Sequence, residues 1–447
     1  MSFFQFSDEL NSFSQKALSK CEKQFAEIDK ITEYNQQRVL KTFQDNSVSE
    51  AHFTSSTGYG YGDRGREVLD ELTAQIFGAE DALIRHSFAS GTHTLAVMLF
   101  GVLRPRDTVL CVTGKPYDTI HSVIGLNDSS VGMGSLKDFD IEFEWVDLKA
   151  DGTVDFEAVE ERLKAKKYKA VYIQRSRGYT LRPTLTNEDI KLISQKVKSF
   201  GDIIVMLDNC YGEFTEYGTP AEAGADIFAG SLIKNPGGGI AKCGGYIAGR
   251  KDLVELCSYR MTTPGIGREV GATLGNTRDI FMGLFNAPHV TGEALKTAVF
   301  TAVLFDMMGY EVSPTYDEKR ADIIQSIKLG TSEKLVAFCQ GLQSGSVVDS
   351  YVVPEPWPMP GYDSDVIMAD ITAMLMKARG VCIFLSNQSV EDLIALKCQN
   401  GFQRSIELSA DAPLREPYAV WLQGGLNFHS AKIGVLLGAQ RVIDVKK

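Results

Sequence analysis

The sequence predicts an α/β fold with a mostly parallel central sheet, helices on both faces, and a smaller C-terminal α/β domain. Strand-like and helix-like segments alternate from about residue 82 to residue 248, which is the pattern of a parallel sheet covered by helices. The 447 residues exceed what one hydrophobic core usually organises, so we expect two domains and terminal arms. Polar residues follow several of the apolar strands, and ligands of such sheets bind at the carboxyl ends of the strands.

The composition argues against several classes of function. Apolar residues make up 44% of the chain and charged residues 23%, as in ordinary soluble globular proteins. The net charge of −11, without a lysine or arginine block, argues against nucleic-acid binding. No apolar run approaches the ~20 residues of a membrane span, and the N-terminus lacks the cationic start of a secretory signal. We therefore expect no membrane association and a cytoplasmic location.

The eight cysteines stand singly in the sequence. None forms a Cys-x-x-Cys pair, and none has a histidine at the spacing of a zinc site. The pattern predicts reduced thiols in a cytosolic protein, with neither a metal site nor a disulfide framework.

An N-terminal arm, residues 1–50, is predicted to be helical from about residue 6 to residue 45, because apolar residues recur there at helical spacing. We interpret it as a packing helix or an oligomerisation arm. A loop rich in glycine, tyrosine and serine follows at 55–65, before a helix at 66–77. Its Tyr59, Tyr61 and Arg64 are good anion ligands, although a plain surface turn has the same composition.

A second candidate anion site lies between a short apolar strand at 82–84 and the apolar helix that follows. Ser90 is the expected N-cap of this helix, with Gly91 and Thr92 next to it. Free N–H groups at a helix N-terminus, with hydroxyl groups beside them, suit a phosphate. An ordinary capped core helix is the other interpretation, and the motif in isolation favours it.

Further apolar strands are predicted at 107–113, 142–146, 170–174 and 203–208, with helices at 156–164 and 187–198. Tyr117 follows the first of these strands, the stretch from Gln174 to Arg177 follows the third, and Asp208 ends the fourth. In a parallel sheet these residues converge at one edge. An aromatic side chain such as Tyr117 could lie flat on a cofactor ring there, although tyrosines are also common in loops without any role.

Lys234 is the most informative single residue. It follows a short apolar strand at 227–229 and Gly230-Ser231, and precedes a glycine-rich turn and a strand at 245–248. We expect such a lysine to be buried, and burial lowers an ammonium pKa, which makes the amine available as a nucleophile. A nucleophilic lysine with a strand-end aspartate, here Asp208, is what a pyridoxal 5'-phosphate (PLP) site needs.

The remaining chain suggests a large domain at 51–290 and a small C-terminal domain at 291–447. A glycine-punctuated segment is expected at 258–288, with helices around 293–308 that bridge the two domains. Within the small domain, residues 347–353 have the pattern of a strand.

These motifs resemble a known family. The chain is similar to methionine γ-lyase-related proteins described as cystathionine β-lyase family proteins involved in aluminium resistance, a branch of the PLP-dependent enzymes of Cys/Met metabolism with fold type I. The resemblance covers residues 50–430 and rests on segments such as STGYGYGDRGR, SGTHTLAVMLFGVLRPRD, LDNCYGEF, GADIFAGSLIKNPGGGIA, PEPWPMPGY and IELSADAPLREPY.

The resemblance implies a role for each matching residue. Lys234 would form the Schiff base with PLP and shuttle a proton, Asp208 would hold the pyridine nitrogen protonated, and Tyr117 would stack on the ring. Hydroxyl and N–H groups near the strand ends would bind the phosphate, while residues of the 55–65 loop would reach the phosphate of a neighbouring subunit in a homodimer or homotetramer. The implied phosphate ligands are Ser90, Gly91, Thr92 and Ser231, with Tyr59 or Tyr61 and Arg64 from the neighbour; Ser176 would lie near the phenolic oxygen of the ring.

Residues 370–404 depart from the family pattern. In the family, the VIMA segment after PGY leads quickly to the IELSAD block, whereas here 370–404 intervene. This atypical stretch lies just before Arg415, which we expect to bind the substrate carboxylate because a guanidinium gives a bidentate clamp.

Taken together, the sequence predicts a PLP-dependent carbon–sulfur lyase. A sulfur-containing amino acid of the cystathionine or methionine type would undergo β- or γ-elimination to a 2-oxo acid and ammonia. Two alternatives stay open: an aminotransferase or aldolase on the same scaffold, and a PLP-binding protein of stress or metal tolerance without lyase turnover. No cluster of carboxylates suggests a site for aluminium itself.

Overall fold

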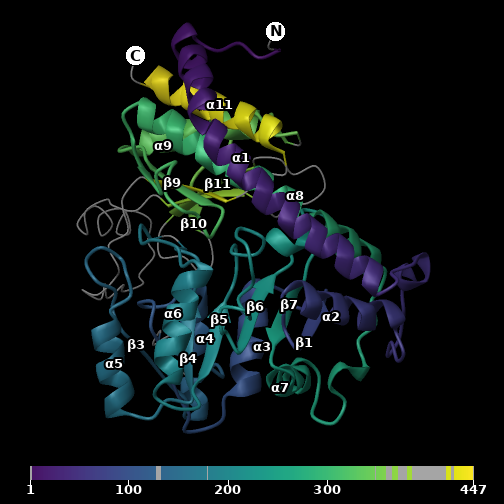
Figure 1. Cartoon of the computed structure of the whole chain (residues 1–447). Helices are drawn as coiled ribbons and strands as arrows, with labels where there is room; N and C mark the ends of the chain where they lie inside the picture. Colours follow the sequence, from purple (N-terminus) through teal and green to yellow (C-terminus); the bar gives the residue numbers. More distant parts are fainter. Residues whose placement is uncertain are drawn as a thin grey trace, which may run out of the picture.

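A computed structural model gives the fold of the chain (Figure 1). It describes residues 3–126, 132–178, 180–347, 349–358, 365–370, 380–384, 419–423 and 427–445. A large α/β unit lies below a smaller unit in the view of Figure 1, and the long helix α1 runs along α8 across both.

The large unit is built on a seven-stranded sheet with the order β1-β7-β6-β5-β4-β2-β3. Strand β7 runs antiparallel to both of its neighbours, and the other neighbouring strands are parallel. The mostly parallel sheet predicted from the alternating pattern is therefore confirmed. Its strands are β1 (Asp81–Arg85), β2 (Thr108–Cys111), β3 (Glu142–Trp145), β4 (Ala170–Gln174), β5 (Ile204–Asp208), β6 (Ile227–Ser231) and β7 (Gly245–Gly249).

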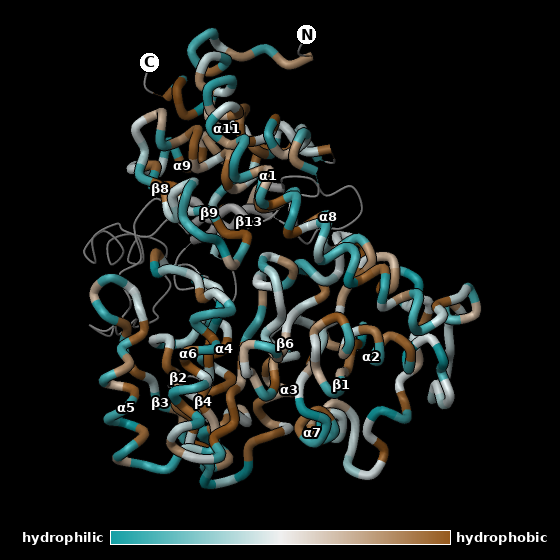
Figure 2. The backbone as a smooth tube through the Cα atoms, in the orientation of Figure 1, coloured by the Kyte–Doolittle hydropathy of each residue, from teal (hydrophilic) through white to brown (hydrophobic). Residues whose placement is uncertain are grey.

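Helices cover both faces of this sheet, as predicted. Alternate residues of a strand point to opposite faces, so every strand except the edge strand β3 contributes to two separate hydrophobic cores. In Figure 2 the central strands are mainly hydrophobic, whereas α5 at the edge is mainly hydrophilic. One core contains side chains of α2 (Arg64–Ile76), α5 (Phe156–Ala165) and α6 (Asn187–Lys198), and the other contains side chains of α3 (Gly91–Val102), α4 (Asp118–Ile124) and α7 (Lys251–Met261).

The smaller unit has an antiparallel sheet with the order β10-β11-β12-β13-β9-β8. Its core also contains the first half of α1, including Leu10 and Ile28, whereas Val39 near the end of α1 belongs to the core of the large sheet. The elements are β8 (Glu311–Ser313), β9 (Ile324–Lys328), β10 (Trp357–Pro358), β11 (Asp365–Asp370), β12 (Gly380–Phe384), β13 (Ala419–Gln423), α1 (Asp8–Asp45), α8 (Thr277–Met307), α9 (Ser332–Ser344) and α11 (Phe428–Val445).

Two expectations about the second half of the chain are wrong. Instead of a glycine-punctuated segment up to residue 288, one helix, α8, begins at Thr277 and continues through Pro288 to Met307. Most of α8 is buried, so packing outweighs the local signals of proline and glycine. The expected strand at 347–353 is also absent from its described residues, which form turns and irregular backbone.

Candidate active site

The end of β6 and the start of α3 lie against each other. Ser90 is the N-cap of α3, as predicted, and its Oγ accepts a hydrogen bond of 3.1 Å from the backbone N–H of His93. A Cβ atom on Gly91 would lie 3.3 Å from the Cβ of Ser231, which is fully buried at the end of β6. Two of the predicted phosphate ligands, distant in sequence, are thus brought together beside a helix N-terminus.

Thr92 and Tyr117 lie close to the same edge of the sheet. The Oγ1 atoms of Thr92 and Thr119 are 2.9 Å apart, which ties the first turn of α3 to the first turn of α4. Tyr117 is the N-cap residue of α4, and its backbone N–H donates a hydrogen bond of 2.7 Å to Oε1 of Gln174. A hydrogen bond therefore joins the loop after β2 to the end of β4 at Tyr117, the residue predicted to stack on a cofactor ring.

Asp208 and Lys234 come from neighbouring strands. Asp208 is the last residue of β5, is buried, and pairs with Ala229 of β6 in the sheet. Its Oδ1 accepts a hydrogen bond of 3.0 Å from the backbone N–H of Cys210. Lys234 follows the end of β6, and its Nζ lies 4.0 Å from the centre of the Tyr211 ring.

The pKa of Lys234 lies above its ordinary value, although burial of the ammonium acts to lower it. The neighbouring acidic groups favour the charged amine more strongly than burial disfavours it; they are Cys210, Tyr211 and Asp208. Burial therefore acts in the expected direction, but the expectation of a lowered pKa for this lysine is wrong because its neighbours outweigh burial.

Ser176 forms a hydrogen bond with the small unit. Its Oγ donates a hydrogen bond of 3.2 Å to Oδ2 of Asp322, which is buried before β9. The backbone N–H of Arg177 donates to the same oxygen, also at 3.2 Å. The segment after β4 thus fixes the position of the small unit relative to the candidate site.

The tyrosines of the 55–65 loop face outward. Tyr59 and Tyr61 are 76% and 65% exposed, their ring centres are 5.9 Å apart, and Arg64 is exposed as well. The loop beneath them is well anchored, because the buried Arg66 donates hydrogen bonds of 2.8 Å to the carbonyls of Gly60 and Gly271. The loop therefore presents two phenols and a guanidinium on a fixed part of the surface.

Three further expectations concern Arg415, a metal site and a membrane-spanning helix. Arg415 lies outside the described residues. Among the described residues, no group of three or more histidines, cysteines or acids could hold a metal ion. In the same part of the chain, no helix is long and apolar enough to cross a membrane.

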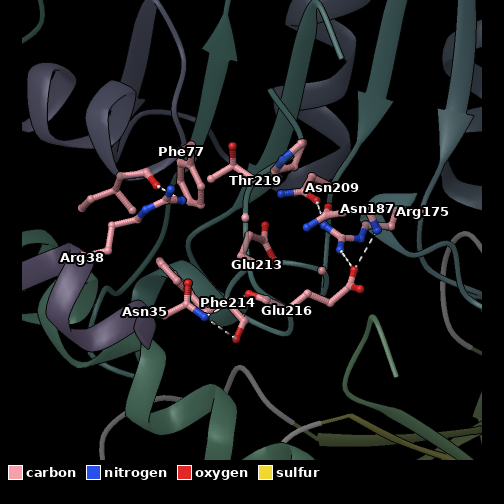
Figure 3. Close-up of a pocket in the computed structure, with 14 residues that line it drawn as sticks. Asn35, Arg38, Phe77, Arg175, Asn187, Asn209, Glu213, Phe214, Glu216 and Thr219 are labelled. Atoms are coloured by element: carbon pink, nitrogen blue, oxygen red, sulfur yellow. Dashed lines mark hydrogen bonds and ion pairs between the residues drawn. The ribbon is translucent and has the colours of Figure 1, made fainter. Parts of the chain in front are cut away.

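Sequence reasoning missed a buried polar network that joins residues after β4 and β5 to β7. Figure 3 shows its members Asn209, Glu213 and Arg175 around a small pocket. The Tyr246 hydroxyl donates a hydrogen bond of 3.0 Å to Oε1 of Glu213, and Asn209 Nδ2 donates one of 2.9 Å to the Tyr246 oxygen. Two features of the sequence could have indicated this network: a glutamate in the short segment after β5 and a tyrosine in the apolar strand β7.

Comparisons with known proteins show to which family the chain belongs. A family model described as methionine gamma-lyase matches residues 10–387 and 397–443. The chain belongs to the methionine gamma-lyase family. The resemblance inferred from the motifs is therefore confirmed, and the internal gap in the match, residues 388–396, lies within the atypical stretch 370–404.

Individual relatives cover nearly the whole chain. The uncharacterized protein YnbB of Bacillus subtilis is 46% identical over 407 residues, which are 91% of this chain and 90% of that protein. A carbon-sulfur lyase involved in aluminum resistance from Clostridium novyi has a crystal structure with a TM-score of 0.87 and 46% identity, covering 98% of this chain and 96% of that one. The PLP-dependent protein YhfS from Escherichia coli, at 12% identity and a TM-score of 0.59, covers 93% of this chain and 97% of its own and shares the fold. The predicted fold type I is confirmed.

Proposed function

We propose that the protein is a PLP-dependent carbon–sulfur lyase that converts a sulfur-containing amino acid to a 2-oxo acid and ammonia by β- or γ-elimination. Membership of the methionine gamma-lyase family and the likeness to a carbon-sulfur lyase of Clostridium novyi support lyase chemistry. The observation that carries the proposal is the placement of Asp208 at the end of β5 and of Lys234 after the adjacent strand β6, next to the close approach of Gly91 and Ser231 at the start of α3.

The residues present fit PLP. The cofactor needs an amine for covalent attachment, a carboxylate for its ring nitrogen and hydrogen-bond donors for its phosphate. Lys234 offers the amine and Asp208 the carboxylate, while the start of α3 offers backbone N–H groups with hydroxyls beside them. Bound PLP supplies an electron sink for the electrons released at the substrate α-carbon. We assign phosphate binding to Ser90, Gly91, Thr92 and Ser231, ring stacking to Tyr117, and contact with the phenolic oxygen to Ser176.

Lys234 carries the proton that the reaction moves. Its surroundings favour the charged amine, so Nζ holds a proton that it can return to the product. Covalent attachment of the cofactor to Lys234 would remove the positive charge of the free ammonium. Nζ, which lies beside Tyr211 and Cys210, would then be free of its own proton and could act as the base once it is released.

We further propose that two or more subunits share their sites. Tyr59, Tyr61 and Arg64 are exposed on a loop that Arg66 anchors, which supports a role in contacting a second copy. A homodimer or homotetramer in which they bind the phosphate of the neighbour accounts for this exposure of phenols and guanidinium on fixed backbone. Mixing Lys234→Ala and Arg64→Ala chains is expected to restore part of the activity that each lacks alone, because one of the two mixed sites is intact.

Arg415 remains our proposed ligand for the substrate carboxylate, because a guanidinium binds a carboxylate in bidentate fashion. We also propose a cytoplasmic location, which the six free cysteines of the described chain support.

The decisive experiment combines spectroscopy with chemical trapping. Purified protein is expected to be yellow, and borohydride reduction followed by peptide mapping is expected to place the reduced cofactor on Lys234. Incubation with cystathionine or methionine, without an amino acceptor, is expected to release 2-oxo acid and ammonia in equal amounts. Protein that stays colourless with added PLP would contradict the cofactor assignment. A requirement for an amino acceptor would instead indicate an aminotransferase, and absence of turnover would indicate a binding protein.

A further inference from the structure

The Tyr117 loop, residues 113–117, is held at both of its ends by Gln174, the last residue of β4. At the start of the loop, Oγ1 of Thr113 accepts a hydrogen bond of 3.0 Å from the backbone N–H of Gln174. At its end, the backbone N–H of Tyr117 donates one of 2.7 Å to Oε1 of the Gln174 side chain. Because β2 and β4 are neighbours in the sheet, one residue at the end of β4 can span the loop that follows β2.

The side chain of Gln174 is itself fixed in place. Gln174 is buried, and its Nε2 donates a hydrogen bond of 3.1 Å to the carbonyl of Ser176. The buried Arg182 donates one of 2.7 Å from Nη2 to the carbonyl of Gln174, and it donates to the carbonyl of Ser176 as well. The oxygen and the nitrogen of the Gln174 amide are thus both engaged, which determines the orientation of the amide.

The turn after Gln174 approaches the ring of Tyr117. Gly178 in this turn has a φ of 57°, in the left-handed region that favours glycine. A Cβ atom on Gly178 would lie 3.6 Å from Cδ2 of Tyr117 and 3.4 Å from Nε2 of Gln174. The Tyr117 ring and the Gln174 amide therefore lie beside the same point of the backbone.

Gln174 also relates the Tyr117 loop to Asp208. In the sheet Gln174 of β4 pairs with Asp208 of β5, so the two residues are neighbours at the edge where the strands end. An amide supplies a donor and an acceptor at this place without a charge. A glutamate would add a second negative charge next to Asp208, which like-charge repulsion disfavours.

We propose that Gln174 is a positioning residue of the candidate active site, which holds the Tyr117 loop against the end of β4 and so sets where the Tyr117 ring lies relative to Asp208. The inference rests on the proposed function only in taking the Tyr117 ring as the surface on which the PLP ring lies. A glutamine with a merely structural role would stabilise the sheet, and its loss would loosen other parts of the large unit as much as the Tyr117 loop.

Hydrogen exchange of the Tyr117 amide tests the anchoring in the full-length protein, freed of bound carbonyl compounds by hydroxylamine. Gln174→Met keeps the length of the side chain and removes both of its hydrogen-bonding groups. We expect the Tyr117 amide to exchange about tenfold faster in this variant, because the loop loses the hydrogen bond that closes it. The Val205 amide, which donates a hydrogen bond of 2.8 Å to Oδ2 of Asp226, should exchange at the same rate in both proteins.

The affinity for PLP tests whether the position of Tyr117 matters to the cofactor. In spectrophotometric titrations of the same proteins, Gln174→Met should raise the Kd for PLP about fivefold, because the loosened Tyr117 loop must be ordered when PLP binds. Gln195→Met, at an exposed position of α6, is the matched control and should change neither the exchange rates nor the Kd.

An unchanged Tyr117 exchange rate in folded Gln174→Met protein would overturn the proposal, and so would equal acceleration at Tyr117 and Val205. Faster exchange at Tyr117 with an unchanged Kd for PLP would also refute it. If Gln174→Met does not fold, Gln174→Asn, whose amide is one methylene group shorter, provides both measurements with the same expectations. A wild-type protein that does not bind PLP would contradict the proposed function, whereas the exchange rates would still decide whether Gln174 positions Tyr117.

Discussion

The pH dependence of stability offers an independent test of the buried Glu213 carboxyl group. Substitution by glutamine keeps an oxygen that accepts the Tyr246 hydrogen bond and removes the titration. The amide NH₂ group of the glutamine would replace Oε2 of Glu213, which has no hydrogen-bond partner in the wild-type structure. Its N–H groups would therefore lack a hydrogen-bond acceptor. That loss of hydrogen bonding costs about 1–3 kcal/mol, but it is the same at every pH.

The sign and size of the pH effect follow from the pKa of Glu213, which burial raises from 4.5 to about 7. Below pH 4.5 the carboxyl group is protonated in both the folded and the unfolded chain, so titration leaves the free energy of unfolding unchanged. Between pH 4.5 and 7 the unfolded chain releases a proton that the folded chain retains, so wild-type stability falls as the pH rises. At about 1.36 kcal/mol per pKa unit, the loss is about 3 kcal/mol and is complete above pH 7.

Urea unfolding of the two proteins at several pH values measures this difference. The stability of the wild type relative to Glu213→Gln should decrease by about 3 kcal/mol between pH 4.5 and pH 8. Glu71→Gln, at an exposed position of α2, is the matched control and should show no such trend. A constant difference between wild type and Glu213→Gln across this range would refute the raised pKa.

Three further outcomes are expected. Lys234→Ala should lose the borohydride-trapped cofactor in peptide mapping and all lyase turnover in 2-oxo acid assays. Lys242 is an exposed lysine in the same glycine-rich segment, and the control variant Lys242→Ala should keep both. Gly230→Ala should lower the unfolding free energy by about 1–3 kcal/mol in urea titrations, because its methyl group would lie 2.4 Å from Glu213 Oε1. Arg66→Ala should destabilise the 55–65 loop by about 3 kcal/mol or more and shift sedimentation toward smaller species, since three hydrogen bonds to carbonyls are lost.

Much of the sheet and its helices could be predicted because their signals are local. The bounds of β4 and α6 agree with the predicted ones, and α6 begins with a capping box in which Thr186 and Asp189 satisfy each other's backbone N–H groups. Helix α8 could not be predicted in this way. Pro288 and the glycines before it favour a break, and only burial against α1 and the sheet, which the linear pattern does not contain, overcomes that preference.

The same distinction between local signals and long-range contacts applies to the candidate site. That Ser90, Asp208 and Lys234 lie at one edge follows from the rule that parallel strands end together, so the pattern alone predicted their neighbourhood. The charge of Lys234 depends instead on which side chains the turn after β5 directs toward it. The Tyr211 ring lies against the Lys234 amine, and the backbone of Tyr211 has a left-handed conformation there. A tyrosine in the sequence does not predict this conformation.

Glu213 was missed for a related reason. Its partner Tyr246 comes from β7, the strand that inserts antiparallel between β1 and β6, so the pair forms only once the sheet order is known. Both residues then occupy an interior where an unpaired polar group is costly, and the hydrogen bond between them offsets part of that cost. A site of this kind is specified in two stages: the strand ends fix where the lysine lies, and the side chains at and after the end of β5 set how strongly it holds its proton.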